Sequence, residues 1–214
     1  MCGASAGVLL RRRIPQRALE LSSQGIALVV FILGTGMALK SEQPLIMTVS
    51  IAAGALTGEL LGIEGAFERA AGRLEKRLGS KAEGFASGFI TASLVYCTGP
   101  MAVLGAFEEG LGGYPSLLLA KGLIDGLESV ALGASMGFGV FFAAFPVYLY
   151  QGALTLAAGV LQPFMTEAAV CEMSAAGGLM LMAIALNLLG LMKIRVMNML
   201  PGLVFAVVLV KLFL

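Results

Sequence analysis

The hydrophobic positions of this chain fall into long runs with short polar links between them. Each run holds about 18 to 26 residues, the length that an α-helix needs to cross a bilayer. With a short apolar piece at residues 1–10, the runs predict an all-α, polytopic membrane protein of about seven to eight transmembrane helices. The other runs cover residues 19–39, 44–63, 84–107, 116–136, 138–161, 173–192 and 196–214.

Residues 64–81 depart from this pattern, because charged and apolar side chains alternate along them. Arg69, Arg73 and Arg77 share the segment with Phe67 and Leu74, which is typical of an amphipathic helix at the membrane surface. We therefore expect four regions. They are helices 1–3 over residues 1–63, a cytoplasmic amphipathic segment over 64–81, central helices 4 and 5 over 82–136, and helices 6–8 over 137–214.

The run over residues 116–136 carries three charged side chains. Lys121, Asp125 and Glu128 follow a spacing of i, i+4 and i+7, which places them on one face of a helix. A charge near the bilayer centre costs roughly 2.5 to 3.5 kcal/mol on insertion scales, so this face should point toward protein or water. Since desolvation offsets much of the attraction within a buried pair, we interpret the three as an ion- or substrate-binding site. An ion-pair network that only fixes helix packing is the alternative.

Two prolines predict breaks inside apolar runs. Pro100 cannot donate a hydrogen bond to the carbonyl of Tyr96, so the helix over residues 84–107 should kink there. Broken membrane helices can expose oxygen atoms to an ion or substrate, and a kink that merely accommodates packing is the alternative. Pro146 predicts the second break, within the run over residues 138–161. The candidate site therefore also includes Gln151, just beyond Pro146, and four polar residues near Pro100. These four are Thr91, Ser93, Tyr96 and Thr98.

A weak internal repeat relates two parts of the chain at a fixed offset of 152 residues. It pairs Glu20 with Glu172, and residues 6–9 with residues 158–161. The offset maps helices 1–3 onto helices 6–8, and a shift of five spans implies the inverted topology of many secondary transporters. Thr35 and Asn187 are equivalent under this offset, so we add both to the candidate site, although interhelical hydrogen bonding is their commoner use. The repeat also predicts that helix 1 lacks its front.

Composition strengthens the membrane assignment and excludes several function classes. Hydrophobic residues make up 58% of the 214 residues and charged residues 13%, against about a quarter charged in soluble domains. The net charge of +1 implies no attraction to nucleic acid. The chain has no histidine, its one aspartate is Asp125, and it has no phosphate-binding loop or metal-ligand cluster. We therefore expect no enzyme, no catalytic residues, no cofactor and no metal.

Four stretches of the sequence resemble a known bacterial family. They are GFITASLVYCTGPMAVLGAFEEGL at residues 88–111, KGLIDGLESV at 121–130, YQG at 150–152 and LNLLGLMKIRVMNMLPG at 186–202. These motifs resemble the inner-membrane family catalogued as domain of unknown function 554, the YdfK/YqgA-like proteins, and the resemblance covers essentially the whole chain. It implies an integral membrane protein of unassigned activity. Members usually begin with a complete Gly-rich first helix, and this sequence departs from them there.

The function that these features favour is a secondary transporter or ion-coupled permease for a small solute. Asp125 would bind and release the coupling cation, H⁺ or Na⁺, with Lys121 tuning its charge and Glu128 extending the path. An ion channel would use the same polar face without alternating access. A non-transporting membrane scaffold that binds a partner is the second alternative. We expect a multi-pass protein of the bacterial inner (plasma) membrane with the lipid bilayer around it, and glycine stripes that also suit a homo-oligomer.

Overall fold

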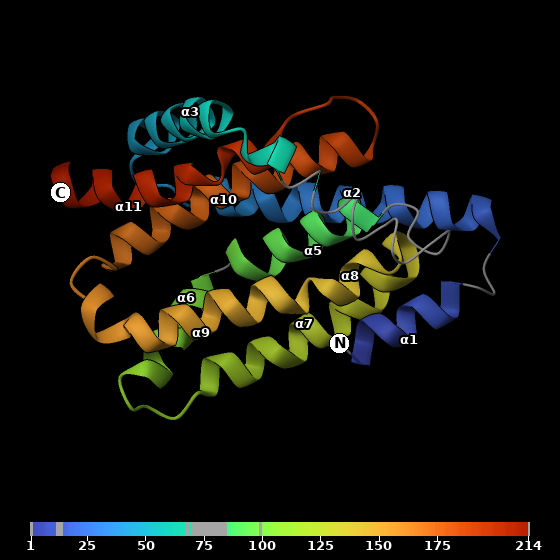
Figure 1. Cartoon of the computed structure of the whole chain (residues 1–214), viewed down its shortest axis with the longest axis horizontal. Helices are drawn as coiled ribbons and strands as arrows, with labels where there is room; N and C mark the ends of the chain where they lie inside the picture. The colour runs from blue at the N-terminus through green and yellow to red at the C-terminus, as the bar shows by residue number, and fades with distance from the viewer. Residues whose placement is uncertain (1, 12–14, 67–68, 70–84, 99, 214) are drawn as a thin grey trace.

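The computed structural model describes residues 2–11, 15–66, 69, 85–98 and 100–213. Helices dominate this part of the chain and none of it forms a β-strand, which confirms the predicted all-α class. Figure 1 shows the long helices arranged in a bundle. The elements are α1 (Cys2–Arg11), α2 (Gln16–Ala38), α3 (Pro44–Leu61), α5 (Phe85–Thr98), α6 (Pro100–Gly110), α7 (Ser116–Met136), α8 (Gly139–Phe142), α9 (Ala144–Leu161), α10 (Glu167–Leu188), the 3₁₀ helix η2 (Val196–Met199) and α11 (Pro201–Phe213).

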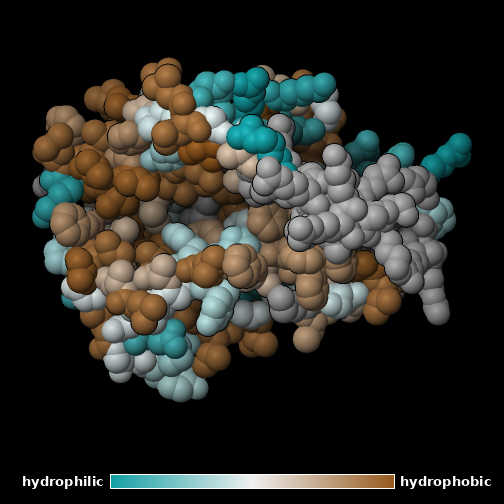
Figure 2. All heavy atoms as spheres, in the orientation of Figure 1, coloured by the Kyte–Doolittle hydropathy of each residue, from teal (hydrophilic) through white to brown (hydrophobic). Residues whose placement is uncertain are grey.

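Four helices of the described chain are long and apolar enough to cross a membrane. They cover Pro44–Leu61, Gly139–Leu161, Glu167–Leu188 and Val196–Phe213, and the bent pair of α5 and α6 makes a fifth if it counts as one span. Figure 2 shows hydrophobic side chains over much of the visible surface, as expected of a protein surrounded by lipid. The larger number of seven to eight spans stays a prediction.

Helix α10 forms the centre of the bundle, and 78% of its apolar span is buried. It packs along α2 and also contacts α3, α5 and α11. The α2–α10 contact depends on two glycines. A Cβ atom on Gly34 would lie 2.5 Å from the carbonyl oxygen of Gly178, and a Cβ on Gly178 would lie 2.5 Å from that of Gly34. The two backbones therefore touch where no larger side chain fits.

Two further helix pairs pack by backbone approach. Helix α3 lies against η2 and α11, with Gly54 and Gly58 facing their backbone. Gly62 behaves differently, because it ends α3 with a φ of +61°, a left-handed conformation that favours glycine. Helix α1 lies against α7, and Gly3 and Gly7 point at the α7 backbone.

One of the two predicted breaks lies where the sequence placed it. Helix α5 ends at Thr98, α6 begins at Pro100, and the two axes differ by 58°. Near Pro146 the helix is interrupted at Ala143, between the end of α8 at Phe142 and the start of α9 at Ala144. Pro146 lies in the first turn of α9, where a missing N–H costs no internal hydrogen bond. The chain turns earlier, at Gly137, whose φ is +80°.

The predicted amphipathic segment over residues 64–81 lies mostly outside the described residues. The structure describes residues 64–66 and Arg69 of it. Its surface position therefore stays a prediction.

Candidate functional site

The charged helix predicted over residues 116–136 has these same bounds in the structure, as α7. Its polar face points inward, as expected, since Lys121 is 6% exposed and Asp125 is half-buried. The opposite face is apolar and open to the surroundings, with Leu123 and Leu127 about three-quarters exposed (74% and 76%). Because lipid accepts leucine and rejects charge, this orientation suits a membrane helix.

Lys121 and Asp125 form an ion pair along α7, between Nζ and Oδ2, with their side chains 8% and 22% exposed. The pair borders a pocket of about 220 Å³. Asp125 lies near the middle of α7, a 21-residue helix that is roughly 30 Å long. The other lining residues are Ala4, Tyr96, Leu118, Gly122, Gly126, Ser129, Val140, Ala144, Val147 and Gln151.

Tyr96 and Gln151 bring polar atoms to this pocket from two other helices. Tyr96, on α5, is 5% exposed, and the Lys121 Nζ lies 5.8 Å from the centroid of its ring. The Tyr96 hydroxyl is buried and finds no hydrogen-bond partner among the described residues. Since an unpaired buried hydroxyl costs free energy, it is a natural contact point for a ligand or water. Of the site residues predicted from the sequence, the structure therefore brings four together at this pocket: Lys121, Asp125, Tyr96 and Gln151.

Thr91 and Asn187 lie elsewhere, at a second pocket of about 180 Å³ between α5 and α10. Thr91 is 1% exposed. The Asn187 side chain is already engaged, because its Oδ1 accepts from the Ile194 N–H and its Nδ2 donates to the Ile194 carbonyl, both at 2.7 Å. Asn187 therefore holds the link after α10, and the central site that pairs it with Thr35 stays a prediction.

The remaining predicted site residues lie outside the central pocket. Thr35 donates to the carbonyl of Phe31 in its own helix, at 2.8 Å. Ser93 is half-buried, and its buried hydroxyl oxygen finds no partner in the described part of the chain. Glu128 is half-buried and is not part of the pocket wall. The side chain of Thr98 lies outside the described residues.

Sequence reasoning missed a buried carboxylate at the end of the bundle. Glu172, on α10, is 1% exposed. Its Oε1 accepts from the N–H groups of Glu42 and Gln43, at 2.8 and 2.9 Å, and its Oε2 accepts from the Ser41 hydroxyl at 2.7 Å. Glu172 thereby satisfies backbone donors at the start of α3. The available signal was an acidic residue directly before the apolar run over residues 173–192.

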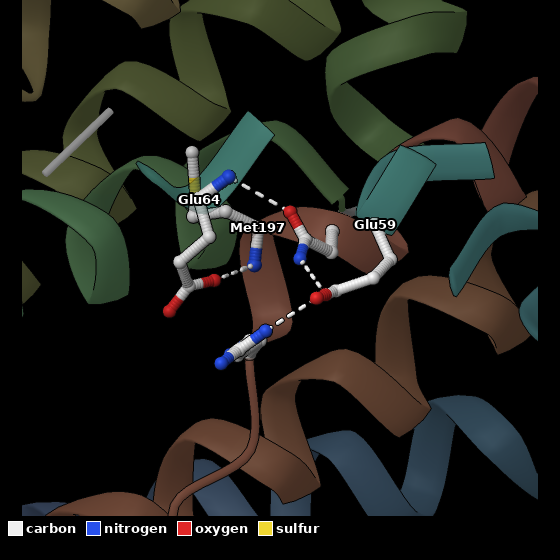
Figure 3. A network of polar contacts seen from close by, with 5 residues as sticks. Glu59, Glu64 and Met197 are labelled. Atoms are coloured by element: carbon white, nitrogen blue, oxygen red, sulfur yellow. Dashed lines mark hydrogen bonds and ion pairs between the residues drawn. The ribbon is translucent and has the colours of Figure 1, made fainter. Parts of the chain in front are cut away.

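A second polar network joins α3 to η2, and Figure 3 shows it. Glu59 pairs with Arg195 and accepts from the Asn198 amide at 2.6 Å. Asn198 in turn accepts from the Glu64 N–H at 2.7 Å, and Glu64 accepts from the Met197 N–H at 3.0 Å. Because Asn198 is 4% exposed and uses both ends of its amide, this network fixes the link that precedes α11.

Comparison with known proteins gives a family. The model of the family "Protein of unknown function (DUF554)" matches residues 1–211. The chain belongs to this family. Two relatives are each 28% identical to this chain. They are the "Uncharacterized membrane protein YdfK" of Bacillus subtilis, matched over 95% of this chain and 88% of its own, and the "Uncharacterized protein YqgA" of Escherichia coli K12, matched over 96% and 90%.

The resemblance found in the sequence motifs is thereby confirmed. Membership of DUF554, together with the apolar helices, establishes a membrane protein. No solved structure matches the chain. The printed names of the relatives assign no activity, so the function must be argued from the pocket itself.

Proposed function

We propose that this DUF554 protein is a secondary transporter that couples movement of a small solute to that of a cation. The observation that carries the proposal is the Lys121–Asp125 pair on the wall of a pocket beside the middle of α7. If α7 crosses the bilayer, as the sequence predicts, this pocket would lie near mid-membrane depth. Intramembrane ionisable residues that face a cavity commonly mark ion and substrate pathways. Asp125 would bind and release the cation, Lys121 would tune its charge, and Glu128 would extend the polar face along α7.

The bounds of the helices are consistent with the inverted repeat predicted from the sequence, which would support this proposal. Shifted by 152 residues, the bounds of α3 become 196 and 213, the first residue of η2 and the last of α11. The same shift moves α2 to residues 168–190, and α10 covers residues 167–188. Inverted repeats with a site near the membrane midplane are a common transporter architecture.

The helix contacts agree with a two-fold relation between the repeats. A two-fold axis pairs each element with its own equivalent, as in an isologous interface. Helix α2 packs on α10, and α3 packs on α11. In the same sense α1 packs on the central helix α7, while its equivalent α9 packs on the central helix α6. The pocket is lined by residues of α1, α5, α7, α8 and α9. Rocking of one repeat against the other would open it to alternate sides.

We further propose a multi-pass protein of the bacterial plasma membrane. The basic links fall on one side when seven to eight spans alternate, and the positive-inside rule places that side in the cytoplasm. Arg195 and the segment over residues 64–81 would then face the cytoplasm. The Glu59–Arg195 contact, which is solvent-exposed at both ends, suits such a membrane–water boundary.

Proteoliposomes that carry the full-length chain test the transporter. A pH-sensitive dye and a Na⁺ indicator report cation movement while small carboxylates, amino acids, amines and sugars are added in turn under imposed H⁺ or Na⁺ gradients. We expect one class to drive flux in the wild type and in Glu167→Gln, which neutralises an exposed carboxylate. The Asp125→Asn variant should lose at least about nine-tenths of this flux while its size-exclusion profile stays unchanged.

A well-folded wild type that gives no flux with any solute or gradient would contradict cation coupling. The polar face of α7 would then serve packing, and a scaffold would become the better description.

A further inference from the structure

We propose that the pocket bordered by α5, α7 and α9 binds a small monocarboxylate together with one proton, the carboxylate on Lys121 and Tyr96 and the proton on Asp125. This inference rests on the transporter proposed above, and it names the solute and the cation. It follows from the polar atoms that the pocket offers, from the charge that the membrane tolerates and from the room available.

Two donors on the pocket wall have hydrogen-bonding capacity to spare, the Lys121 ammonium and the Tyr96 hydroxyl. The Lys121 ammonium has three N–H donors, of which one goes to Asp125. The buried Tyr96 hydroxyl has no partner in the described chain, and Gln151 adds an amide. Asp125 is the one carboxylate in the lining. A ligand that accepts hydrogen bonds fits this set better than one that donates them, and a carboxylate accepts through two oxygens.

Electroneutrality favours the proton as the coupling ion. In the empty pocket the charges of Lys121 and Asp125 cancel. When a carboxylate pairs with Lys121, Asp125 loses its partner, and a buried unpaired charge costs several kcal/mol. Taking up a proton from solution makes Asp125 neutral, so the loaded pocket again carries no net charge. Both states thereby avoid an uncompensated charge inside the membrane.

The ionisable groups around Asp125 come from two helices, α5 and α7. The ionisable groups that act on it or on its partners are Lys121 and Glu128 of α7 with Tyr96 and Cys97 of α5. The lining residues of α1, α8 and α9 are not ionisable; they are Ala4, Val140, Ala144, Val147 and Gln151.

The pocket has room for a small ligand. Its volume of about 220 Å³ is several times the ~30 Å³ that one water molecule occupies in the liquid. That space suits a carboxylate with a short chain. Leu118, Val140 and Val147 on the wall offer apolar contacts to that chain.

Binding to the purified full-length protein in detergent tests the inference without requiring transport. The probes are radiolabelled acetate, propionate and lactate, with glycine and methylammonium for comparison, over a range from mildly acidic to mildly basic pH. Wild-type affinity should fall about tenfold per pH unit, because the fraction of protonated Asp125 falls by that factor. The Asp125→Asn variant should bind lactate at every pH, with no such slope.

Lys121→Met should weaken lactate binding by at least about tenfold, while Lys211→Met, which changes an exposed lysine of α11, should bind as the wild type does. Because Lys121→Met leaves a buried carboxylate unpaired, the double variant Lys121→Met/Asp125→Asn is measured beside it, and it should not bind either. No binding of any of the three carboxylates, tighter binding of glycine or methylammonium, or unchanged binding in the double variant would overturn the inference.

The two proposals fail in different ways. Lactate binding with the expected pH slope but without flux in proteoliposomes would uphold the carboxylate site and overturn transport. Cation flux driven by another solute class, without carboxylate binding, would uphold transport and overturn the carboxylate site. Lactate-driven uptake of Na⁺ in place of H⁺ would overturn the proton on Asp125.

Discussion

Glu172 is the most completely enclosed acidic side chain among the described residues, and each of its oxygens accepts a hydrogen bond. Its three donors all come from residues 41–43, the link between α2 and α3. Those backbone N–H groups precede the first turn of α3 and have no partner within that helix. The side chain of one helix therefore sets where the next helix begins.

Replacing Glu172 with leucine should destabilise the protein by roughly 2 to 4 kcal/mol, because a hydroxyl and two N–H groups then lose their acceptor. Thermal unfolding in detergent, followed by size exclusion, measures the change. Glu20→Leu is the matched control, since Glu20 occupies the equivalent position of the repeat and is exposed on α2. Equal melting temperatures for the two variants would contradict the role assigned to Glu172.

Individual residues were predictable where a local pattern decides their position. Lys121 and Asp125 are one helical turn apart, so their shared face followed from helix geometry alone. Asn187 bonds to Ile194, in the link after its own helix. Glu172 bonds to the link between α2 and α3, which is far away in the sequence. No periodicity encodes such contacts, and so the sequence could neither exclude Asn187 from the pocket nor find Glu172.

The contact between α2 and α10 decides how the two proposed repeats meet. Gly34 faces the α10 backbone, whereas Gly36, two residues on, has no atom within 4 Å of the position its Cβ would take. The two glycines lie in the same helix and differ in what surrounds them, so their alanine variants form a matched comparison.

Gly34→Ala should destabilise the bundle by about 1 to 3 kcal/mol, because the new methyl group overlaps a carbonyl and the helices must move apart. Gly36→Ala should leave stability unchanged or raise it by up to about 1 kcal/mol, since alanine favours a helix over glycine. Unfolding temperatures of the two variants in the same detergent give the comparison. A less stable Gly36→Ala, or an unaffected Gly34→Ala, would contradict this packing.

The sequence predicted some element bounds well and others poorly. Helix α7 begins and ends at the predicted residues, since a proline precedes it and a glycine follows it. A proline signals either a break or a helix start, and both occur near Pro146, since α8 ends at Phe142 and α9 begins at Ala144. No signal in the sequence marked the further turn at Gly137, whose positive φ only the structure reveals.

At the scale of the whole molecule, paired helices surround a small polar pocket. The outer faces of the bundle are apolar, with residues such as Leu60 and Leu156 almost fully exposed (89% and 92%). These faces suit lipid, and assembly of a homo-oligomer through them stays a prediction. The whole-chain architecture was predictable only in class, because the packing of helices depends on glycine contacts between distant segments.

The central claim is that solute and cation pass through the Lys121–Asp125 pocket, and a plug tests it most directly. Gly122 lines the pocket and has no atom within 4 Å of the position its Cβ would take, so Gly122→Leu adds bulk without a clash near the backbone. Gly159→Leu is the matched control, because Gly159 of α9 is equally unobstructed and is not part of the pocket wall. Leucine favours a helix over glycine at both positions.

The measurement is solute-driven proton uptake into proteoliposomes that hold equal amounts of wild type, Gly122→Leu or Gly159→Leu. The account predicts that Gly122→Leu loses at least about nine-tenths of the uptake while Gly159→Leu keeps the wild-type rate. Equal uptake by both variants would contradict the claim, since a blocked pocket would then leave the pathway open.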